Sequence, residues 1–249
     1  MPETNLSRRS FLTAFTAVAA GGGLSACMPL FNSASRTKPR TEEEAPQPSG
    51  FTTSSIDRPP AASGQDTALR YRDIYAARTD GGFTLPAVPY ARLNPQYLRQ
   101  IVDYPTEEKP DTIVVDRAHH YLYLVQENGT AIRYGIAIGK DGFSWSGKAI
   151  VQYKKAWPSW HPPAEMVQRL PELERYGGGR GMGPALDNPL GSRAFYIYQN
   201  GQDTLYRVHG TPEWWTIGKN VSSGCIRLFN QDIIDLYDRT PQKTYILVI

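Results

Sequence analysis

The chain has few of the residues that usually build metal centres or disulfide frameworks. Only two cysteines, Cys27 and Cys225, and four histidines occur among its 249 residues. The histidines lack His-Glu-x-x-His spacing and the cysteines are not paired as in zinc sites, so no metal site is predicted. Two cysteines also rule out a framework of several disulfides, and each must be explained by its own surroundings.

The chain also lacks a long apolar run and a strong charge of either sign. The uncharged stretch from Phe11 to Ala26 has 16 residues, whereas a membrane-spanning helix needs about 20 predominantly apolar ones. The formal net charge is +3, and nothing in its distribution calls for nucleic acid as a partner. Residues 177–181 are glycine-rich but lack the lysine and following helix of a phosphate-binding loop, so no cofactor is predicted.

The N-terminal segment has the features of an export signal. Arg8 and Arg9 stand directly before the uncharged stretch, which predicts a twin-arginine signal over residues 1–26. Its end resembles a bacterial lipobox, in which a peptidase cuts before a lipidated cysteine, here Cys27. Lipidation there would anchor the protein to a membrane. The alternative is an ordinary signal peptide cleaved just before that cysteine, and both alternatives predict the periplasm or cell envelope.

Composition divides the rest of the chain into three parts. Residues 27–66 are rich in proline, serine and threonine and have few bulky apolar side chains, so we expect a flexible tether. Residues 67–110 carry apolar anchors interrupted by prolines, which predicts an irregular extension packed on the domain, with a short helix near residues 94–102. Residues 111–249 have dense strand signals and form the expected folded domain.

Within that domain, short runs rich in β-branched and aromatic residues predict strands. The expected strands are 112–116, 121–125, 131–138, 148–155, 194–198, 204–209 and 244–249. A short helix is expected over 163–175 in an irregular insertion. Another is expected over 231–239, where apolar residues have amphipathic spacing. The sequence therefore predicts one mainly β domain with a helix after the second cysteine.

Cys225 follows His209 by sixteen residues, and a cysteine with a histidine elsewhere in the chain can be a nucleophile and its base. A free thiol with a pKa of about 8.5 is mostly protonated at neutral pH. A neighbouring imidazolium would stabilise the thiolate as an ion pair and later protonate a leaving amine. The alternative is a buried structural thiol, because free cysteine is among the most buried residue types.

The residues around Cys225 could complete such a site. Backbone N–H groups of Gly224 and Cys225 are placed to stabilise an oxyanion, and the glycine permits a tight turn. Arg227 would lie on the same side of an extended segment as Cys225. It could bind a carboxylate of the substrate or fix the loop.

Several elements resemble, in order, the catalytic domain of the L,D-transpeptidases, the YkuD-like family of peptidoglycan enzymes. They are Tyr134-Gly-Ile-Ala-Ile-Gly-Lys140, Asn188-Pro-Leu-Gly191, His209-Gly-Thr211, Ile217-Gly218 and Ser222-Ser-Gly-Cys-Ile-Arg-Leu228. The resemblance implies a β-sandwich or barrel in which Cys225 is the nucleophile, His209 the base and the Gly210 carbonyl the group that orients the imidazole. The chain departs from the family pattern at Ser223, where a histidine is usual. A serine hydroxyl can donate a hydrogen bond to the oxyanion but cannot carry charge near neutral pH.

The resemblance also implies a reaction on peptidoglycan. Cys225 would attack the amide between a meso-diaminopimelate-type residue and the terminal D-alanine of a tetrapeptide stem, releasing D-alanine and leaving a thioester. The acceptor amine could belong to a second stem, giving a 3-3 crosslink, or to an envelope protein. Water would instead make the enzyme a carboxypeptidase or amidase. A peptidoglycan-binding lipoprotein without turnover also remains open, whereas a papain-like peptidase has its cysteine before its histidine.

Three further residues are candidates for substrate binding. Trp160 and Arg180 lie in the insertion, and Trp214 lies between His209 and Cys225 with Trp215 beside it. Each could flank a groove for the donor peptide. The alternative for the tryptophans is packing in the core or in loops, and for the arginine a place on a flexible rim.

Overall fold

The computed structural model describes residues 70–139, 146–222 and 224–249. The expected signal segment 1–26 with Cys27, the tether 27–66 and Ser223 lie outside the described residues. Among the described residues, no helix has both the length and the apolar character needed to cross a bilayer.

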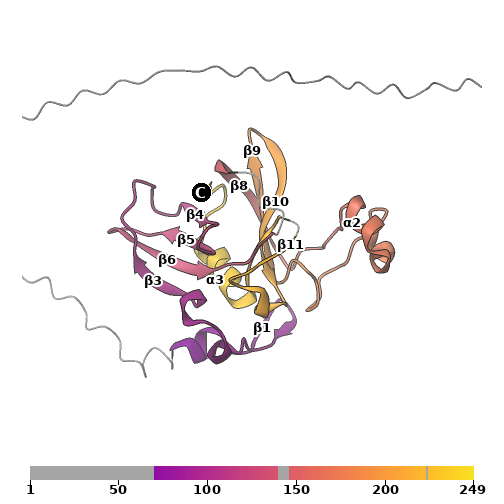
Figure 1. Ribbon diagram of the computed structural model, residues 1–249, viewed down its shortest axis with the longest axis horizontal. Helices are drawn as coiled ribbons and strands as arrows, with labels where there is room; N and C mark the ends of the chain where they lie inside the picture. Colours follow the sequence, from indigo (N-terminus) through magenta and orange to yellow (C-terminus); the bar gives the residue numbers. More distant parts are fainter. Residues whose placement is uncertain (1–69, 140–145, 223) are drawn as a thin grey trace, which may run out of the picture. The chain divides into compact units, whose positions relative to one another are not determined.

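One mixed sheet of nine strands dominates the fold (Figure 1). In spatial order its strands are β12 (Ile226–Phe229), β10 (Gln202–Thr211), β9 (Arg193–Gln199), β8 (Gly147–Ala156), β13 (Tyr245–Val248), β4 (Ile113–Asp116), β5 (Tyr121–Val125), β6 (Thr130–Gly135) and β3 (Gln100–Asp103). Two pairs are parallel, β10 with β12 and β13 with β4, and the other neighbours are antiparallel. All seven expected strand regions form strands, and the mainly β class is confirmed.

The sheet folds back on itself around the largest of the buried clusters. Leu124 of β5 belongs to the same buried cluster as Phe195 of β9 and Leu228 of β12, although β5 lies far from these two strands in the sheet order. The two halves of the sheet, β3–β6 and β8–β10, run at a steep angle to each other in Figure 1. Reciprocal backbone hydrogen bonds of 2.9 Å between Ala137 and Arg227 join the segment after β6 to β12. The expected sandwich or barrel architecture is therefore confirmed.

Both expected helical regions are present. The insertion contains α2 (Ala164–Arg169) followed by a 3-10 helix, η3 (Pro171–Tyr176), and Figure 1 shows this part projecting beyond the sheet. The helix α3 (Asn230–Arg239) follows β12 directly and buries Ile233 and Leu236 against the core. The apolar spacing that predicted α3 is thus the spacing of its core-facing side.

The N-terminal segment differs from its prediction. Instead of a helix over residues 94–102, a single 3-10 turn, η2 (Pro95–Tyr97), is followed by strand β3. The side chain of Asn94 caps this turn by accepting from the Gln96 N–H, and the N-terminal proline suits a helix start. Beyond the turn, β6 offers its edge to β3, and this pairing is not local in the sequence. The helix prediction was wrong because it considered only local signals.

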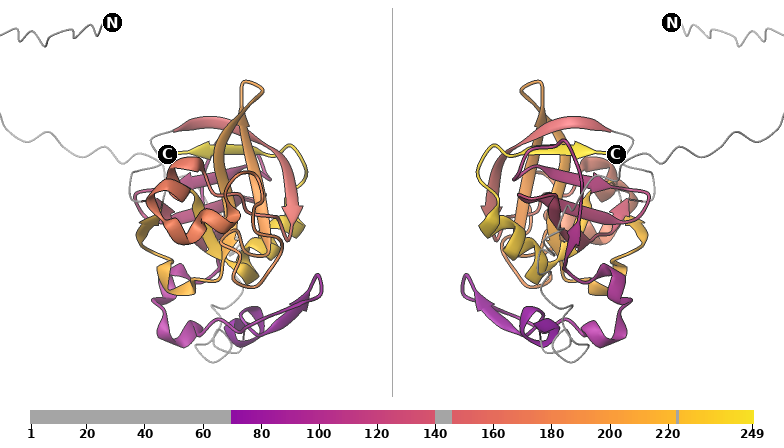
Figure 2. Two further views of the ribbon diagram at one scale, coloured as in Figure 1. Left: turned by 90° about the vertical axis from the view of Figure 1, so that its right-hand side faces the viewer. Right: turned by 90° about the vertical axis from the view of Figure 1, so that its left-hand side faces the viewer.

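Smaller elements complete the fold. A hairpin of β1 (Arg78–Asp80) and β2 (Phe83–Leu85) was not expected from the sequence, nor was the 3-10 turn η1 (Tyr90–Arg92). A two-stranded parallel pair joins β7 (Ile138–Gly139) to β11 (Asn220–Ser222), the segment that leads to Cys225. The two views in Figure 2 show the β1–β2 hairpin at one end of the domain, apart from the main sheet.

Candidate active site

The parallel pairing of β10 with β12 sets the arrangement of the candidate catalytic residues. His209 stands opposite Arg227, and Val208 stands opposite Ile226. Because side chains alternate along a strand, Val208 and Ile226 enter the core, while His209 and Arg227 share the other face. Cys225 precedes Arg227 by two residues and follows the same alternation. The fold therefore brings His209 and Cys225 to one face of this strand pair.

The imidazole of His209 is held in one orientation. Its Nδ1 lies 2.6 Å from the backbone oxygen of Gly210, and the residue is only 3% exposed. Because a carbonyl oxygen can only accept, Nδ1 must carry the proton in this contact. In the neutral ring, Nε2 is then the unprotonated nitrogen that can accept a proton. The family resemblance predicted that the Gly210 carbonyl orients the imidazole through this contact.

Cys225 is a partly buried free thiol that directly follows a glycine with positive φ. The preceding Gly224 has φ of +106°, a backbone conformation that side chains disfavour, and a Cβ there would lie 3.2 Å from the Tyr206 ring. The backbone N–H of Arg207 donates a hydrogen bond to the Cys225 sulfur. This donor stabilises the thiolate relative to the thiol.

Burial controls the ionisation of both groups. It raises the pKa of the Cys225 thiol, against the lowering effects of the Arg207 N–H and of the charges of Arg207 and Arg227. It lowers the pKa of His209 to about 3, although the hydrogen bond to Gly210 favours the charged ring. In the free protein these directions favour a neutral thiol and a neutral imidazole, not the charged pair expected from the sequence.

Two cavities meet at Cys225. One, of about 530 Å³, is lined by Cys225, His209 and Arg227. The other, of about 630 Å³, is lined by Cys225 and Arg207. Trp160, Met166 and Leu190 of the insertion line both cavities. Cys225 is thus shared by both cavities beneath the insertion.

The insertion is anchored at both of its ends. At the start, the Trp157 indole stacks on Phe83 with ring centroids 4.1 Å apart and donates to Asp80. Asp80 in turn binds both terminal nitrogens of Arg193, at 2.7 and 2.8 Å. At the far end, the fully buried amide of Asn188 donates to backbone oxygens of the insertion and accepts from the Leu190 N–H. These contacts fix the segment that covers the cavities.

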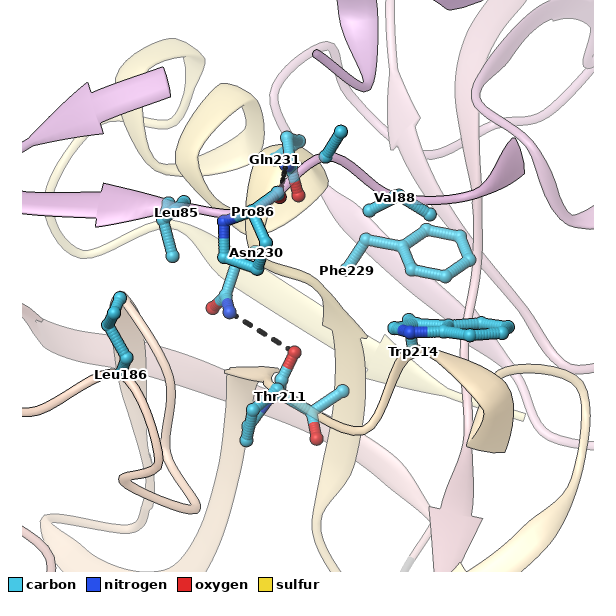
Figure 3. A pocket seen from close by; sticks show the side chains of 11 residues that line it. Leu85, Pro86, Val88, Leu186, Thr211, Trp214, Phe229, Asn230 and Gln231 are labelled. Atoms are coloured by element: carbon cyan, nitrogen blue, oxygen red, sulfur yellow. Dashed lines mark hydrogen bonds between the residues drawn. The ribbon is translucent and has the colours of Figure 1, made fainter. Parts of the chain in front are cut away.

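Asn230, the first residue of α3, connects this helix to the segment before β9 and to the end of β10, close to His209. Its Oδ1 accepts from the Ser192 N–H at 2.9 Å, and its Nδ2 donates to the Thr211 oxygen at 3.2 Å (Figure 3). A Cβ on Gly191 or on Gly210 would lie 2.3 Å from this Oδ1. Asn230 therefore requires glycine at both positions, including the one whose carbonyl orients His209.

The predicted substrate-binding residues do not all reach these cavities. Trp160 lines both cavities, and Arg227 lines the smaller one. Arg180 is not among the lining residues, and its guanidinium donates to the backbone oxygen of Glu174. Trp214 is also absent from both linings and packs with Phe229 in a second buried cluster, as Figure 3 shows.

Two charged residues of the site were missed by the sequence analysis. Arg207 precedes His209 by two residues in β10, so the alternation rule would have found it. Glu213 pairs with Arg227 at 2.7 Å, and both line the smaller of the two cavities. No local signal announces this contact, because it depends on how the connection after β10 turns back. Among the described residues, no group of three potential ligands is placed to hold a metal ion.

Comparison with known proteins adds an independent finding. The family described as the L,D-transpeptidase catalytic domain, YkuD, matches residues 110–249. The chain is 36% identical over 154 residues to a probable L,D-transpeptidase, YbiS, of Escherichia coli strain K12, which covers 56% of this chain and 46% of that protein. It is 34% identical over 109 residues to a putative L,D-transpeptidase of Fuscovulum blasticum, covering 44% and 52%. The chain thus spans about half the length of these relatives.

Solved structures also resemble the chain. One from Brucella melitensis, titled as a probable carnitine operon oxidoreductase, is 45% identical and covers 61% of this chain and 94% of that one, with a TM-score of 0.43. At this TM-score the structural likeness adds nothing to the family assignment, which rests on the match over residues 110–249. That match covers more than half of the sequence and includes both His209 and Cys225. The chain belongs to the YkuD family of L,D-transpeptidase catalytic domains.

Proposed function

We propose that this protein is a peptidoglycan L,D-transpeptidase that uses Cys225 as nucleophile and His209 as base. The observation that carries the proposal is the shared face of β10 and β12. There His209 and Cys225 line one cavity, with the imidazole fixed on the Gly210 carbonyl. The proposed substrate is the tetrapeptide stem of peptidoglycan, on which the family acts.

The proposed reaction begins from the neutral couple. As the sulfur attacks the carbonyl that precedes the terminal D-alanine, Nε2 of His209 takes the thiol proton, and the carbonyl electrons move to its oxygen. Collapse of this intermediate breaks the amide bond, and the imidazolium gives its proton to the leaving D-alanine amine. A thioester on Cys225 remains. An acceptor amine then attacks it and returns the thiol through the same proton transfers.

The starting protonation states suit this order of events. Because burial lowers the pKa of His209 to about 3, the imidazole is almost entirely neutral at pH 7, and it becomes an effective base only as the developing thiolate charge raises its pKa. The positive charges of Arg207 and Arg227 stabilise the thiolate as it forms. The same charges disfavour the imidazolium, so it returns its proton readily to the departing amine.

Backbone donors next to the sulfur are the proposed oxyanion site. The N–H groups of Gly224 and Cys225 precede β12, and the positive φ of Gly224 shapes this turn. Removing one such donor in a comparable site costs about 2.7–4 kcal/mol of transition-state stabilisation. The Ser223 hydroxyl is a further proposed donor.

Arg227 is the proposed site for a carboxylate of the stem. Its Nη1 is engaged by Glu213, whereas its buried Nε has no hydrogen-bond partner among the described residues. A substrate carboxylate would bind on the side of the guanidinium that lines the cavity. Trp160 lies on the wall of both cavities and is the proposed apolar contact for the stem.

The two cavities provide space for a donor and an acceptor in a transfer reaction. Because Cys225 lines both, a donor stem could occupy one while an acceptor amine approaches the thioester from the other. The acceptor would be a second stem, giving a 3-3 crosslink, or an envelope protein. Hydrolysis by water, as in an L,D-carboxypeptidase, is the alternative outcome. Equimolar release of D-alanine and formation of crosslinked dimer would distinguish transfer from hydrolysis.

The decisive experiment is incubation of the purified protein with tetrapeptide muropeptides. Wild-type protein should release D-alanine and form the thioester, visible as an added mass on the intact protein. Cys225→Ala should do neither. His209→Gln should lower the rate of thioester formation by about 10²–10⁴-fold, the usual contribution of a general base. Stem binding without any D-alanine release would support the peptidoglycan-binding lipoprotein instead.

We further propose that the protein acts in the cell envelope as a lipoprotein anchored through Cys27. The sequence over residues 1–27 supports this proposal, together with the envelope location of the substrate. After expression in a bacterial host, wild-type protein should partition into detergent, and Cys27→Ser should appear in the aqueous phase. Equal partitioning of the two proteins would contradict the anchor.

A further inference from the structure

A third cavity lies apart from the catalytic residues. Its volume is about 340 Å³, at the lower end of the range for ligand sites. One wall comes from the connection after β10, here named the Trp loop (residues 212–219), and the other from residues 92–97 of the N-terminal segment. Neither Cys225 nor His209 is among the lining residues. This is where the Trp214 and Trp215 side chains are found.

The walls of this cavity are aromatic. The Trp214 and Trp215 rings meet at 88° with centroids 5.6 Å apart, and Trp215 is 51% exposed. Tyr97 packs against the Trp loop. A Cβ on Gly218 of this loop would lie 2.3 Å from the Tyr97 ring. An indole left half in water at the mouth of a cavity offers a flat apolar face for a ligand.

The charges at the cavity are all of one sign. Arg92 and Lys219 are exposed and line it, whereas no aspartate or glutamate does. Arg92 lies over the Trp214 ring at 5.6 Å. Neither cation forms an ion pair with any carboxylate in the described part of the chain. The cavity thus combines an exposed aromatic face with two available positive charges and suits a ligand with a flat C–H surface and carboxylates.

We propose that this cavity binds the glycan strand of peptidoglycan, with a sugar ring on Trp215 and a muramyl carboxylate at Arg92 and Lys219. This inference rests on the proposed function for its choice of polymer. The Trp loop links the two sites, because Glu213 at its start pairs with Arg227 in the catalytic cavity. A strand bound on one side of the loop would present its stems near the other side. Binding energy from this remote part would then support reaction at Cys225.

Calorimetric titration of full-length Cys225→Ala protein tests this site without requiring turnover. The probe is glycan strand stripped of its stems by an amidase, which leaves free lactyl carboxylates. We expect Trp215→Ala to weaken binding about three- to tenfold, the range for loss of one aromatic contact. Arg92→Gln with Lys219→Gln should weaken it further and reduce its salt dependence. Chitin oligosaccharides, which lack carboxylates, should bind more weakly than the stripped strands.

Matched controls separate the site from general effects. Tyr245→Ala removes an aromatic residue that is 62% exposed on β13, and Lys109→Gln removes an exposed charge elsewhere. Both should leave glycan affinity unchanged. Equal affinities for wild-type, Trp215→Ala and the double charge variant would overturn the site. Binding of free tetrapeptide but not glycan at this cavity would overturn the proposed occupant.

Activity assays distinguish this inference from the proposed function. In the otherwise wild-type protein, Trp215→Ala should keep its kcat/KM on free tetrapeptide and lose it on intact glycan-linked substrate. If no variant has any turnover, the proposed function fails while the calorimetric result stands. If turnover is normal and Trp215→Ala acts equally on both substrates, the glycan site fails alone.

Discussion

His209 and Arg227 stand directly opposite each other in the parallel pairing of β10 with β12. This neighbour places a positive charge beside an imidazole whose burial already lowers its pKa to about 3. The same burial raises the pKa of the Cys225 thiol. The position of Arg227 and the burial of both groups therefore oppose a thiolate–imidazolium pair in the free protein. The ionisation of the thiol can be measured directly.

Alkylation of Cys225 by iodoacetamide between pH 6 and 10 should report the raised thiol pKa. Because only the thiolate reacts, the rate should rise with a midpoint above the usual value of about 8.5. Near pH 6 the rate should be low in wild-type protein and equally low in His209→Ala. Rapid alkylation at pH 6 that disappears in His209→Ala would establish a resting ion pair instead.

Replacing Asn230 with alanine should destabilise the protein by about 1–3 kcal/mol, because it leaves the buried Ser192 N–H and Thr211 carbonyl without partners. Urea denaturation measures this free energy of unfolding. Asn220→Ala is the control, since Asn220 is exposed and its contact with His120 lies at the surface. That change should stay within about 0.5 kcal/mol. Equal effects of the two variants would show that Asn230 does not connect the elements behind His209.

Local patterns in the sequence were enough to predict much of this fold. The strand runs 113–116 and 121–125 and the amphipathic helix α3 follow from β-branched enrichment and apolar spacing. Strand β3 was mistaken for a helix because its partner, β6, lies much further along the chain, and local patterns do not reveal such a pairing. The parallel pairing of β10 with β12, which creates the site, is likewise invisible to local pattern.

In the candidate site, too, some features could be predicted from local patterns and others depend on the folded structure. His209, Cys225 and the Gly210 carbonyl could be named from their motifs, and they lie together on β10 and beside β12. The protonation states could not be predicted, because burial of both groups in the folded domain decides them. Trp214 looked like a groove residue by its position between His209 and Cys225. The turn of the Trp loop carries it to the cavity on the other side.

Asp80→Asn tests the anchor of the insertion. The pair of Asp80 with Arg193 is largely buried, with side-chain exposures of 15% and 9%, so removing the negative charge should cost about 3–5 kcal/mol. The Arg193 hydrogen bonds lower the pKa of Asp80, so this contribution is present above about pH 4 and is lost as pH falls through the lowered pKa. Glu108→Gln, which breaks an exposed pair with Lys148, should cost at most about 1 kcal/mol. Similar losses in both variants would contradict a special role for Asp80.

Two glycines with nearly the same φ allow the cost of backbone strain to be measured apart from the cost of a steric clash. Gly218 and Gly201 have φ of +83° and +78°, but a Cβ on Gly218 would lie 2.3 Å from the Tyr97 ring, whereas Gly201 faces open space. Gly201→Ala should cost about 1–3 kcal/mol from backbone strain alone. Gly218→Ala should cost clearly more, because the Trp loop must also move off Tyr97. Equal melting temperatures of the two variants would show that the loop is not held by this contact.

Asp232 of α3 gives a prediction for stability against pH. It is fully buried beside Arg99, Tyr75 and Asp235, and burial raises its pKa to about 7 although the Arg99 charge opposes this. The folded state therefore holds a proton that the unfolded chain releases near pH 4. By linkage, the contribution of this bound proton to the free energy of unfolding is fully present below about pH 4. It declines as pH rises to about 7, by at most about 1.4 kcal/mol per pH unit.

Asp232→Asn, which keeps the shape but not the proton equilibrium, should remove that slope. Its free energy of unfolding, measured in urea from pH 4 to pH 8, should rise relative to wild type as pH increases. Asp238→Asn on the exposed side of the same helix should leave the wild-type slope in place. Parallel curves for wild type and Asp232→Asn would mean that Asp232 is ionised throughout, because the Arg99 charge would then outweigh the penalty of burial.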